Sequence, residues 1–162
     1  MHELKLPSTR CKREFYAELR TQLSALLEGE TDLIANTANM ASLLYHTLPD
    51  VNWAGFYFLK GGELVLGPFH GKPACVRIAM GKGVCGSAAA ARKSVLVEDV
   101  HAFPGHIACD AASRSELVVP LVLGGELLGV LDLDSPLPGR FDEEDKAGCE
   151  SLAAALLASL ES

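Results

Sequence analysis

Two pairs of adjacent glycines, Gly61-Gly62 and Gly124-Gly125, constrain the fold of this chain more than any other feature. Each pair lies between two short runs of residues that favour strands, in VNWAGFYFLKGGELVLG and in VVPLVLGGELLGVLDLDS. A two-residue turn whose central residues both have positive φ is the favoured connection of a β-hairpin, and glycine adopts this conformation without strain. The sequence therefore predicts two long hairpins and a mainly antiparallel sheet.

Helical patterns precede and follow the hairpins. Apolar residues three and four positions apart predict one helix between Phe15 and Leu26, and a second that begins at Thr31 or Asp32 and stops at Pro49. The segment GKGVCGSAAAARKS predicts a glycine loop that runs into an alanine-rich helix.

Four further segments complete the order of elements. We expect ACVRIAM and VLVEDV to form short strands and residues 101–113 to form a loop or one irregular turn. A last helix should follow Phe141, with Asp142 as its cap. The predicted fold is a single α+β domain over residues 1–162, with helices packed on a sheet of about six strands.

Composition limits the classes of function. The 162 residues are 49% apolar, which is enough for a core, and the net charge of −7 leaves no basic stripe for nucleic acid. The first 20 residues lack the apolar core of a signal peptide, and no run approaches the roughly 18 apolar residues of a membrane span. We expect a cytoplasmic protein without a nucleic-acid or membrane partner.

The chain has five cysteines, an odd number, and a framework of structural disulfides is not expected in the cytoplasm. Cys109 lies in a polar, loop-like stretch, GHIACDAASRSELVVPL, where a thiol is accessible. Cys85 lies at a predicted helix start, where backbone N–H groups favour a thiolate, and Cys75 lies in a strand-like run. Cys11 and Cys149 fall on predicted helices, and we interpret both as structural or incidental. At rest the thiols should be reduced.

Two alternative uses of these thiols remain open at this point. Zinc bound by Cys75, Cys85, Cys109 and His106 would need long-range folding, because the sequence has neither a CxxC motif nor a compact histidine pair. A Cys–His nucleophile for acyl transfer would need His106 or a neighbouring histidine at Cys109. We expect no metal site.

Carboxylates form the second unusual feature. The alternation of a strand places Asp132 and Asp134 of GVLDLDS on one face, about 7 Å apart. With a regular two-residue turn at Gly124-Gly125, Glu116 would face the opposite side of the sheet. A bulge near Pro120, or a three-residue loop, would instead set Glu116 against Asp134, and we predict this shift.

The chain resembles the free methionine-(R)-sulfoxide reductase family, which is built on a GAF-type fold. The resemblance extends from about Val51 to Ser135 and includes WAGFY, ACVRI, GVCG, DVHAFPGHIACD, SRSELVVPL and GVLDLDS in that order. It implies an enzyme that reduces free L-methionine (R)-S-oxide, a product of oxidative stress. A non-catalytic GAF module that senses a small ligand or redox state is the main alternative, and a zinc-stabilised domain is a third.

The resemblance implies roles for three thiols. Cys109 would attack the sulfoxide sulfur and become a sulfenic acid while methionine departs. Cys75 or Cys85 would condense with the sulfenic acid to a disulfide, which thioredoxin and its NADPH-dependent reductase would reduce. No bound cofactor is implied. A homodimer is expected from the resemblance alone.

The resemblance also implies a substrate pocket. Glu116, Asp132 and Asp134 would hold the substrate ammonium group and assist at the sulfoxide oxygen, with the division of roles left open. Trp53 and Tyr57 would form the wall around the S-methyl group. From the glycine loop itself, we also expect the backbone N–H groups near Cys85 to bind the substrate carboxylate.

Overall fold

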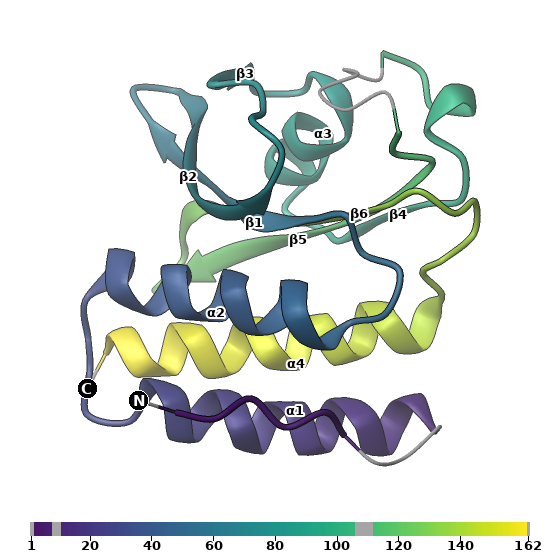
Figure 1. The fold of residues 1–162 in the computed structure, drawn as a ribbon. Helices are drawn as coiled ribbons and strands as arrows, with labels where there is room; N and C mark the ends of the chain where they lie inside the picture. The colour runs from purple at the N-terminus through teal and green to yellow at the C-terminus, as the bar shows by residue number, and fades with distance from the viewer. Residues whose placement is uncertain (1, 8–10, 106–111, 162) are drawn as a thin grey trace.

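The computed structural model describes residues 2–7, 11–105 and 112–161, which form four α-helices, one short 3-10 helix and six strands (Figure 1). The helices are α1 (Lys12–Leu27), α2 (Leu33–Thr47), α3 (Gly83–Ala91) and α4 (Glu143–Leu160), and η1 (Val100–Ala102) is the 3-10 turn. The strands are β1 (Trp53–Lys60), β2 (Glu63–Gly71), β3 (Arg77–Ala79), β4 (Val95–Val97), β5 (Ser115–Leu123) and β6 (Glu126–Ser135). The predicted order of elements is confirmed.

The six strands form one antiparallel sheet in the order β3-β2-β1-β6-β5-β4. Helices α2 and α4 cover one face, α1 packs on α4 away from the sheet, and α3 covers the opposite face (Figure 1). The core is accordingly divided in two, with a large apolar cluster beneath the sheet and a smaller one between the sheet and α3. The smaller cluster is the one that borders the candidate site.

Both predicted hairpin turns are present. Gly61 and Gly62 have φ of 61° and 83°, and Gly124 and Gly125 have φ of 60° and 81°. The residues that flank each pair are partners in the ladder, so each turn contains two residues. The positive φ values explain why glycine occupies these four positions.

Two of the predicted helices have an aspartate side chain as their N-terminal cap. The carboxylate of Asp32 accepts a hydrogen bond from the Ala35 N–H at 2.8 Å, which selects Asp32 over Thr31 as the cap of α2. Asp142 accepts from the N–H groups of Glu144 and Asp145, and the Asp145 side chain accepts from the N–H of Asp142 in return. This reciprocal capping box orients α4.

Two predicted strands are shorter than expected. Only Val95–Val97 of VLVEDV forms a strand, and the other case changes the position of a cysteine. Only Arg77–Ala79 of ACVRIAM forms a strand, and Cys75 lies in the irregular segment before it. Gly71 has a φ of 134°, where the chain leaves β2, and Pro73 has no N–H to donate to a ladder. Pairing resumes where the Val76 carbonyl accepts from Leu66 N–H. The prediction that Cys75 lies in a strand was therefore wrong.

Within the described residues, no helix combines the length and the apolar character needed to cross a membrane.

Candidate active site

A pocket lies between the N-terminal turn of α3 and the face of the sheet that α3 covers. Six of the residues singled out from the sequence line it: Trp53, Tyr57, Cys85, Glu116, Asp132 and Asp134. They come from β1, α3, β5 and β6, so the fold brings together side chains that are up to 81 positions apart in the chain. Cys109 and His106 lie outside the described residues.

The predicted register shift is present. Glu116 pairs with Asp134, and the ladder is irregular between Leu121 and Val122, where Leu128 has no opposite residue. The extra residue allows a two-residue turn to coexist with the Glu116–Asp134 pairing. Asp132 pairs with Val118, two positions further along the ladder, so all three carboxylates lie on the face that borders α3.

Burial changes the protonation of these carboxylates. Glu116 is 6% exposed and Asp132 is 5% exposed. Desolvation raises the pKa of both groups well above the usual carboxyl range, and repulsion from Asp134 raises the pKa of Glu116 further. The Asp132 pKa is also raised by the charge of Glu116. A carboxyl group in this pocket therefore retains a proton at pH values where an exposed one is ionised, and it can act as a proton donor.

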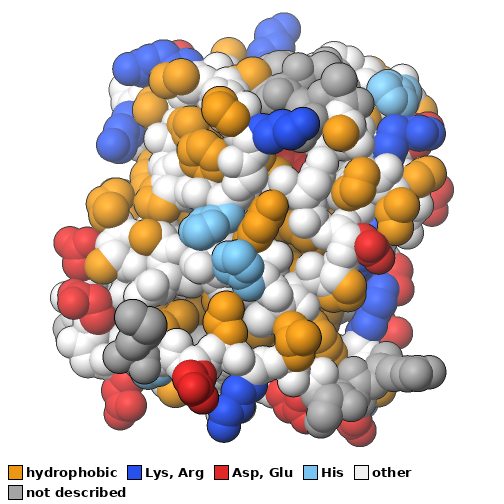
Figure 2. Space-filling view, viewed as in Figure 1, with side chains coloured by type: hydrophobic (Ala, Val, Ile, Leu, Met, Phe, Trp, Pro, Cys, Tyr) orange, Lys and Arg blue, Asp and Glu red, His pale blue; other side chains and the backbone are white. Residues whose placement is uncertain are grey.

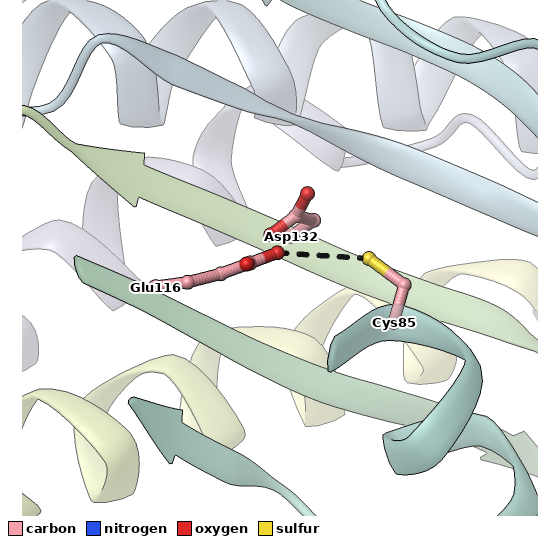
Figure 3. A group of neighbouring side chains, drawn as sticks. All are labelled: Cys85, Glu116 and Asp132. Atoms are coloured by element: carbon pink, nitrogen blue, oxygen red, sulfur yellow. Dashed lines mark hydrogen bonds between the residues drawn. The ribbon is translucent and has the colours of Figure 1, made fainter. Parts of the chain in front are cut away.

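Cys85 contacts the same carboxylates. Its thiol lies 3.8 Å from Oε2 of Glu116, and Figure 3 shows Cys85 on α3 pointing toward Glu116 and Asp132 on their strands. The next residue, Gly86, allows the first turn of α3 to pack closely against the end of β3, because a Cβ there would collide with the Ala79 carbonyl oxygen. Burial, followed by the charges of Asp132 and Glu116, raises the Cys85 pKa well above that of a free thiol.

The expected thiolate at Cys85 is thus contradicted. The sequence placed this residue correctly at the start of a helix, but the stabilising effect of a helix N-terminus is at most about 2 kcal/mol. Complete desolvation next to carboxylates opposes ionisation more strongly. The Cys85 thiol is therefore neutral in the ligand-free pocket.

Two aromatic side chains form the other wall of the pocket. Trp53 and Tyr57 lie on the same face of β1, and their rings stack with centroids 5.9 Å apart. Each also donates a hydrogen bond to the backbone of the irregular segment after β2. Trp53 Nε1 donates to the Lys72 carbonyl, and Tyr57 Oη donates to the Cys75 carbonyl, both at 3.0 Å.

The cysteines are in two states. Cys75 is disulfide-bonded, whereas Cys85 and Cys149 carry free thiols. Cys75 is therefore in its oxidised state in this structure. Cys149 is fully buried, and burial raises its pKa to about 12, which agrees with its interpretation as a structural residue.

Sequence reasoning missed the cations of the pocket. Lys72 and Lys82 line it, and both follow a glycine in a loop, GKP and GKG, which was a usable signal. Figure 2 shows several lysine and arginine side chains toward the end of the molecule that carries α3 and β3, although the net charge is −7. The side chain of Lys82 makes no capping hydrogen bond to α3. The backbone N–H groups of the first turn of α3, from Gly83 onward, border the same pocket as these two lysines. Together they form surroundings that favour a bound carboxylate.

Comparisons with known proteins agree with this arrangement. Residues 35–161 match the GAF domain family. The chain is 61% identical to Protein YtsP of Bacillus subtilis, over 83% of this chain and 84% of that one. It is 56% identical to the free methionine-R-sulfoxide reductase of Escherichia coli, over 90% of this chain and 88% of that one.

A solved structure supports the same relationship at the level of the fold. The free methionine-R-sulfoxide reductase of Neisseria meningitidis, determined in complex with its substrate, superposes with a TM-score of 0.94 at 44% identity. The match covers 99% of this chain and 96% of that one. Sequence identity, fold and pocket lead to one conclusion: the chain belongs to the free methionine-R-sulfoxide reductase family of GAF-domain proteins.

Proposed function

We propose that this protein reduces free L-methionine (R)-S-oxide to L-methionine. One observation carries the proposal: three carboxyl groups on one side and two stacked aromatic rings on the other border a single pocket between the sheet and α3. A free amino acid with an ammonium group, a carboxylate and an S-methyl group has a complementary partner for each of these parts.

The substrate is held by both of its charged ends. Asp134 binds its ammonium group, and the N–H groups at the start of α3, near Val84 and Cys85, bind its carboxylate. The S-methyl group lies against Trp53. A peptide-bound sulfoxide lacks both free ends and would bury an amide where the pocket provides ionic partners, so it is rejected.

The chemistry requires a nucleophile and a proton donor. The Cys109 thiolate attacks the sulfoxide sulfur while a protonated carboxyl group, Glu116 or Asp132, delivers a proton to the sulfoxide oxygen. The oxygen passes to Cys109, which becomes a sulfenic acid, and the sulfide methionine departs. The raised pKa values of Glu116 and Asp132 support this role, because the donor must retain its proton near neutral pH.

A second thiol then resolves the sulfenic acid. Cys75 attacks the Cys109 sulfur, the disulfide forms, and the sulfenic oxygen leaves as water. Two observations support Cys75 over Cys85 in this role: Cys75 is already in a disulfide, and the Cys85 thiol is buried against Glu116. Thioredoxin, or a similar dithiol, then reduces the disulfide, so one dithiol is oxidised for each methionine and water released.

The setting of this activity is also part of the proposal. We infer that the protein works in the cytoplasm, where thioredoxin and NADPH keep the thiols cycling. We also infer, from the family, that it acts as a homodimer. Size-exclusion chromatography with light scattering tests the second inference directly.

A coupled assay tests the function. Purified protein with thioredoxin, thioredoxin reductase and NADPH should consume NADPH with free methionine (R)-sulfoxide, and not with the (S) epimer or an N-acetylated, amidated sulfoxide. Cys109→Ser should abolish the activity, and Cys11→Ser, at an exposed thiol directly before α1, is the matched control that should retain it. Substrate binding without NADPH consumption would favour the sensor alternative and refute the reductase.

A further inference from the structure

Three ligand atoms in the pocket are arranged as a partial metal site. The Cys85 sulfur, a Glu116 oxygen and an Asp132 oxygen all lie within 4.8 Å of one another, and the sulfur is 3.8 Å from Oε2 of Glu116 (Figure 3). Around tetrahedral zinc, with bonds of about 2.3 Å to sulfur and about 2.0 Å to oxygen, the sulfur and oxygen ligands are about 3.5 Å apart. Small side-chain rotations therefore suffice to close the three atoms on one ion.

A separate observation indicates that this cluster binds a ligand. Oδ1 of Asp132 has no hydrogen-bond partner within the described part of the chain, although the residue is only 5% exposed and lines the pocket. A buried oxygen left without a hydrogen bond is destabilising, and more so if it is charged. A cation that enters the pocket removes this cost, whereas a well-packed apolar ligand would not.

The donor set selects the type of cation. One sulfur and two carboxylates suit a borderline-soft ion such as Zn²⁺, whereas Mg²⁺ and Ca²⁺ require six or more oxygen ligands. The three residues come from α3, β5 and β6, so packed elements hold their backbones in place. The fourth tetrahedral position would face the open pocket, as in sites that exchange ligands.

The geometry points to a second ligand of this pocket: Zn²⁺, bound by Cys85, Glu116 and Asp132 in the reduced, substrate-free protein and in competition with the substrate. The ion is an inhibitory ligand rather than a resident cofactor. On binding, the thiol of Cys85 loses its proton to the buffer as the sulfur–metal bond forms, and no electron is transferred. This site shares Cys85 with the zinc alternative raised from the sequence, but the carboxylates of Glu116 and Asp132 take the place of Cys75, Cys109 and His106.

Cobalt(II) provides a direct test, because a thiolate ligand to Co²⁺ gives a charge-transfer band in the near ultraviolet. Reduced protein, freed of small thiols under anaerobic conditions, is titrated with Co²⁺ and then with Zn²⁺. We expect a saturable band at one Co²⁺ per chain that Zn²⁺ abolishes. Cys85→Ser should remove the band, and Asp132→Asn should weaken Co²⁺ binding at least about tenfold.

Matched thiol variants locate the ion. Cys11→Ser removes an exposed thiol and Cys149→Ser a buried one far from the pocket, and both should leave the band intact. A band that persists in Cys85→Ser but disappears in Cys75→Ser or Cys109→Ser would overturn the assignment. So would the absence of any band in the wild-type protein, a result that does not depend on whether a variant folds.

Competition links the ion to the substrate pocket. Free methionine sulfoxide added to the wild-type cobalt complex should displace the ion and reduce the band, and N-acetylated, amidated sulfoxide should not. The competition depends on the proposed function, but the cobalt band does not require turnover. A protein that binds Co²⁺ through Cys85 and never reduces the sulfoxide would therefore refute the reductase proposal and leave the metal site standing. If the protein reduces the sulfoxide but excess sulfoxide leaves the cobalt band unchanged, the ion and the substrate do not compete, and this part of the proposal is refuted.

Discussion

The Tyr57 hydroxyl donates a hydrogen bond to the backbone carbonyl of Cys75 at 3.0 Å. Trp53 Nε1 makes the equivalent bond to Lys72 three positions earlier, so two side chains of the pocket wall hold the irregular segment that carries Cys75. Tyr57 is 2% exposed and stacks on Trp53, which fixes its direction. The wall that would receive the substrate thus also positions the thiol that would resolve the sulfenic acid.

Tyr57→Phe should slow disulfide formation more than methionine release. The substitution keeps the ring and removes only the hydrogen bond to Cys75. Rapid-quench measurement of methionine release and dimedone trapping of the sulfenic acid separate the two steps, and the trapped fraction should increase severalfold over wild type. If Tyr57 instead assists the sulfur chemistry, release will slow and no sulfenic acid will accumulate, which contradicts the positioning role. Tyr45→Phe, on α2, is the matched control.

Asp134→Asn should shift the alkaline limit of activity to lower pH. The charge of Asp134 raises the pKa of Glu116, so its removal lowers that pKa and the donor loses its proton earlier as the pH rises. The pH profile of kcat at saturating sulfoxide measures this shift, which separates it from weaker substrate binding. Glu150→Gln on α4, where Glu150 bonds to Ser94, is the control and should leave the profile in place. An unchanged alkaline limb in Asp134→Asn would argue against Glu116 as the donor.

Asp132→Asn should abolish activity and stabilise the ligand-free protein at pH 8. The folded-state pKa of Asp132 lies above its unfolded value. Its contribution to stability is therefore complete below about pH 4 and is lost as the pH rises through the folded-state pKa. A tenfold difference between the proton affinities of the folded and unfolded states corresponds to about 1.4 kcal/mol, or roughly 2–6 °C in Tm for a chain of this size.

The pH dependence is the distinguishing measurement for Asp132→Asn. Calorimetry at pH 4.5 and pH 8 should show a Tm difference from wild type that grows with pH. An equal difference at both values would indicate a packing effect unrelated to ionisation. Leu128→Ala, at the bulge of the same strand, should show such a pH-independent change.

Asp142→Ala should destabilise the fold without altering the pocket. Asp142 caps α4 through two backbone N–H groups and also contacts Lys12, whose hydrogen bond lowers the Asp142 pKa to about 2. Loss of a helix cap costs about 0.5–2 kcal/mol, measurable by urea unfolding. The cost should diminish between pH 4 and pH 2, because a carboxyl with a lowered pKa stabilises only while it is ionised. Asp142→Asn retains a capping acceptor and should lose less. If Asp142→Asn destabilises the protein as much as Asp142→Ala does, the effect comes from the ion pair with Lys12 and not from the helix cap.

Much of the fold was predictable because its signals are local. The glycine pairs Gly61-Gly62 and Gly124-Gly125 act through their own φ angles, and Asp32 and Asp142 act on N–H groups two or three residues away. The strand alternation of GVLDLDS placed Asp132 and Asp134 on one face before any tertiary contact was known. The bulge was predictable only indirectly, from the requirement that three carboxylates share a pocket.

The sequence by itself determined the order of the elements, the two hairpin turns and the shared strand face of residues such as Asp132 and Asp134, since each of these depends on neighbours along the chain. Tertiary structure alone decided the state of those residues. Cys85 begins a helix as expected, yet its thiol is neutral because β5 and β6 bury it beside Glu116 and Asp132. Cys75 left its predicted strand for a segment held by Tyr57. Desolvation and hydrogen bonds between distant segments set protonation and position, and neither leaves a local pattern in the sequence.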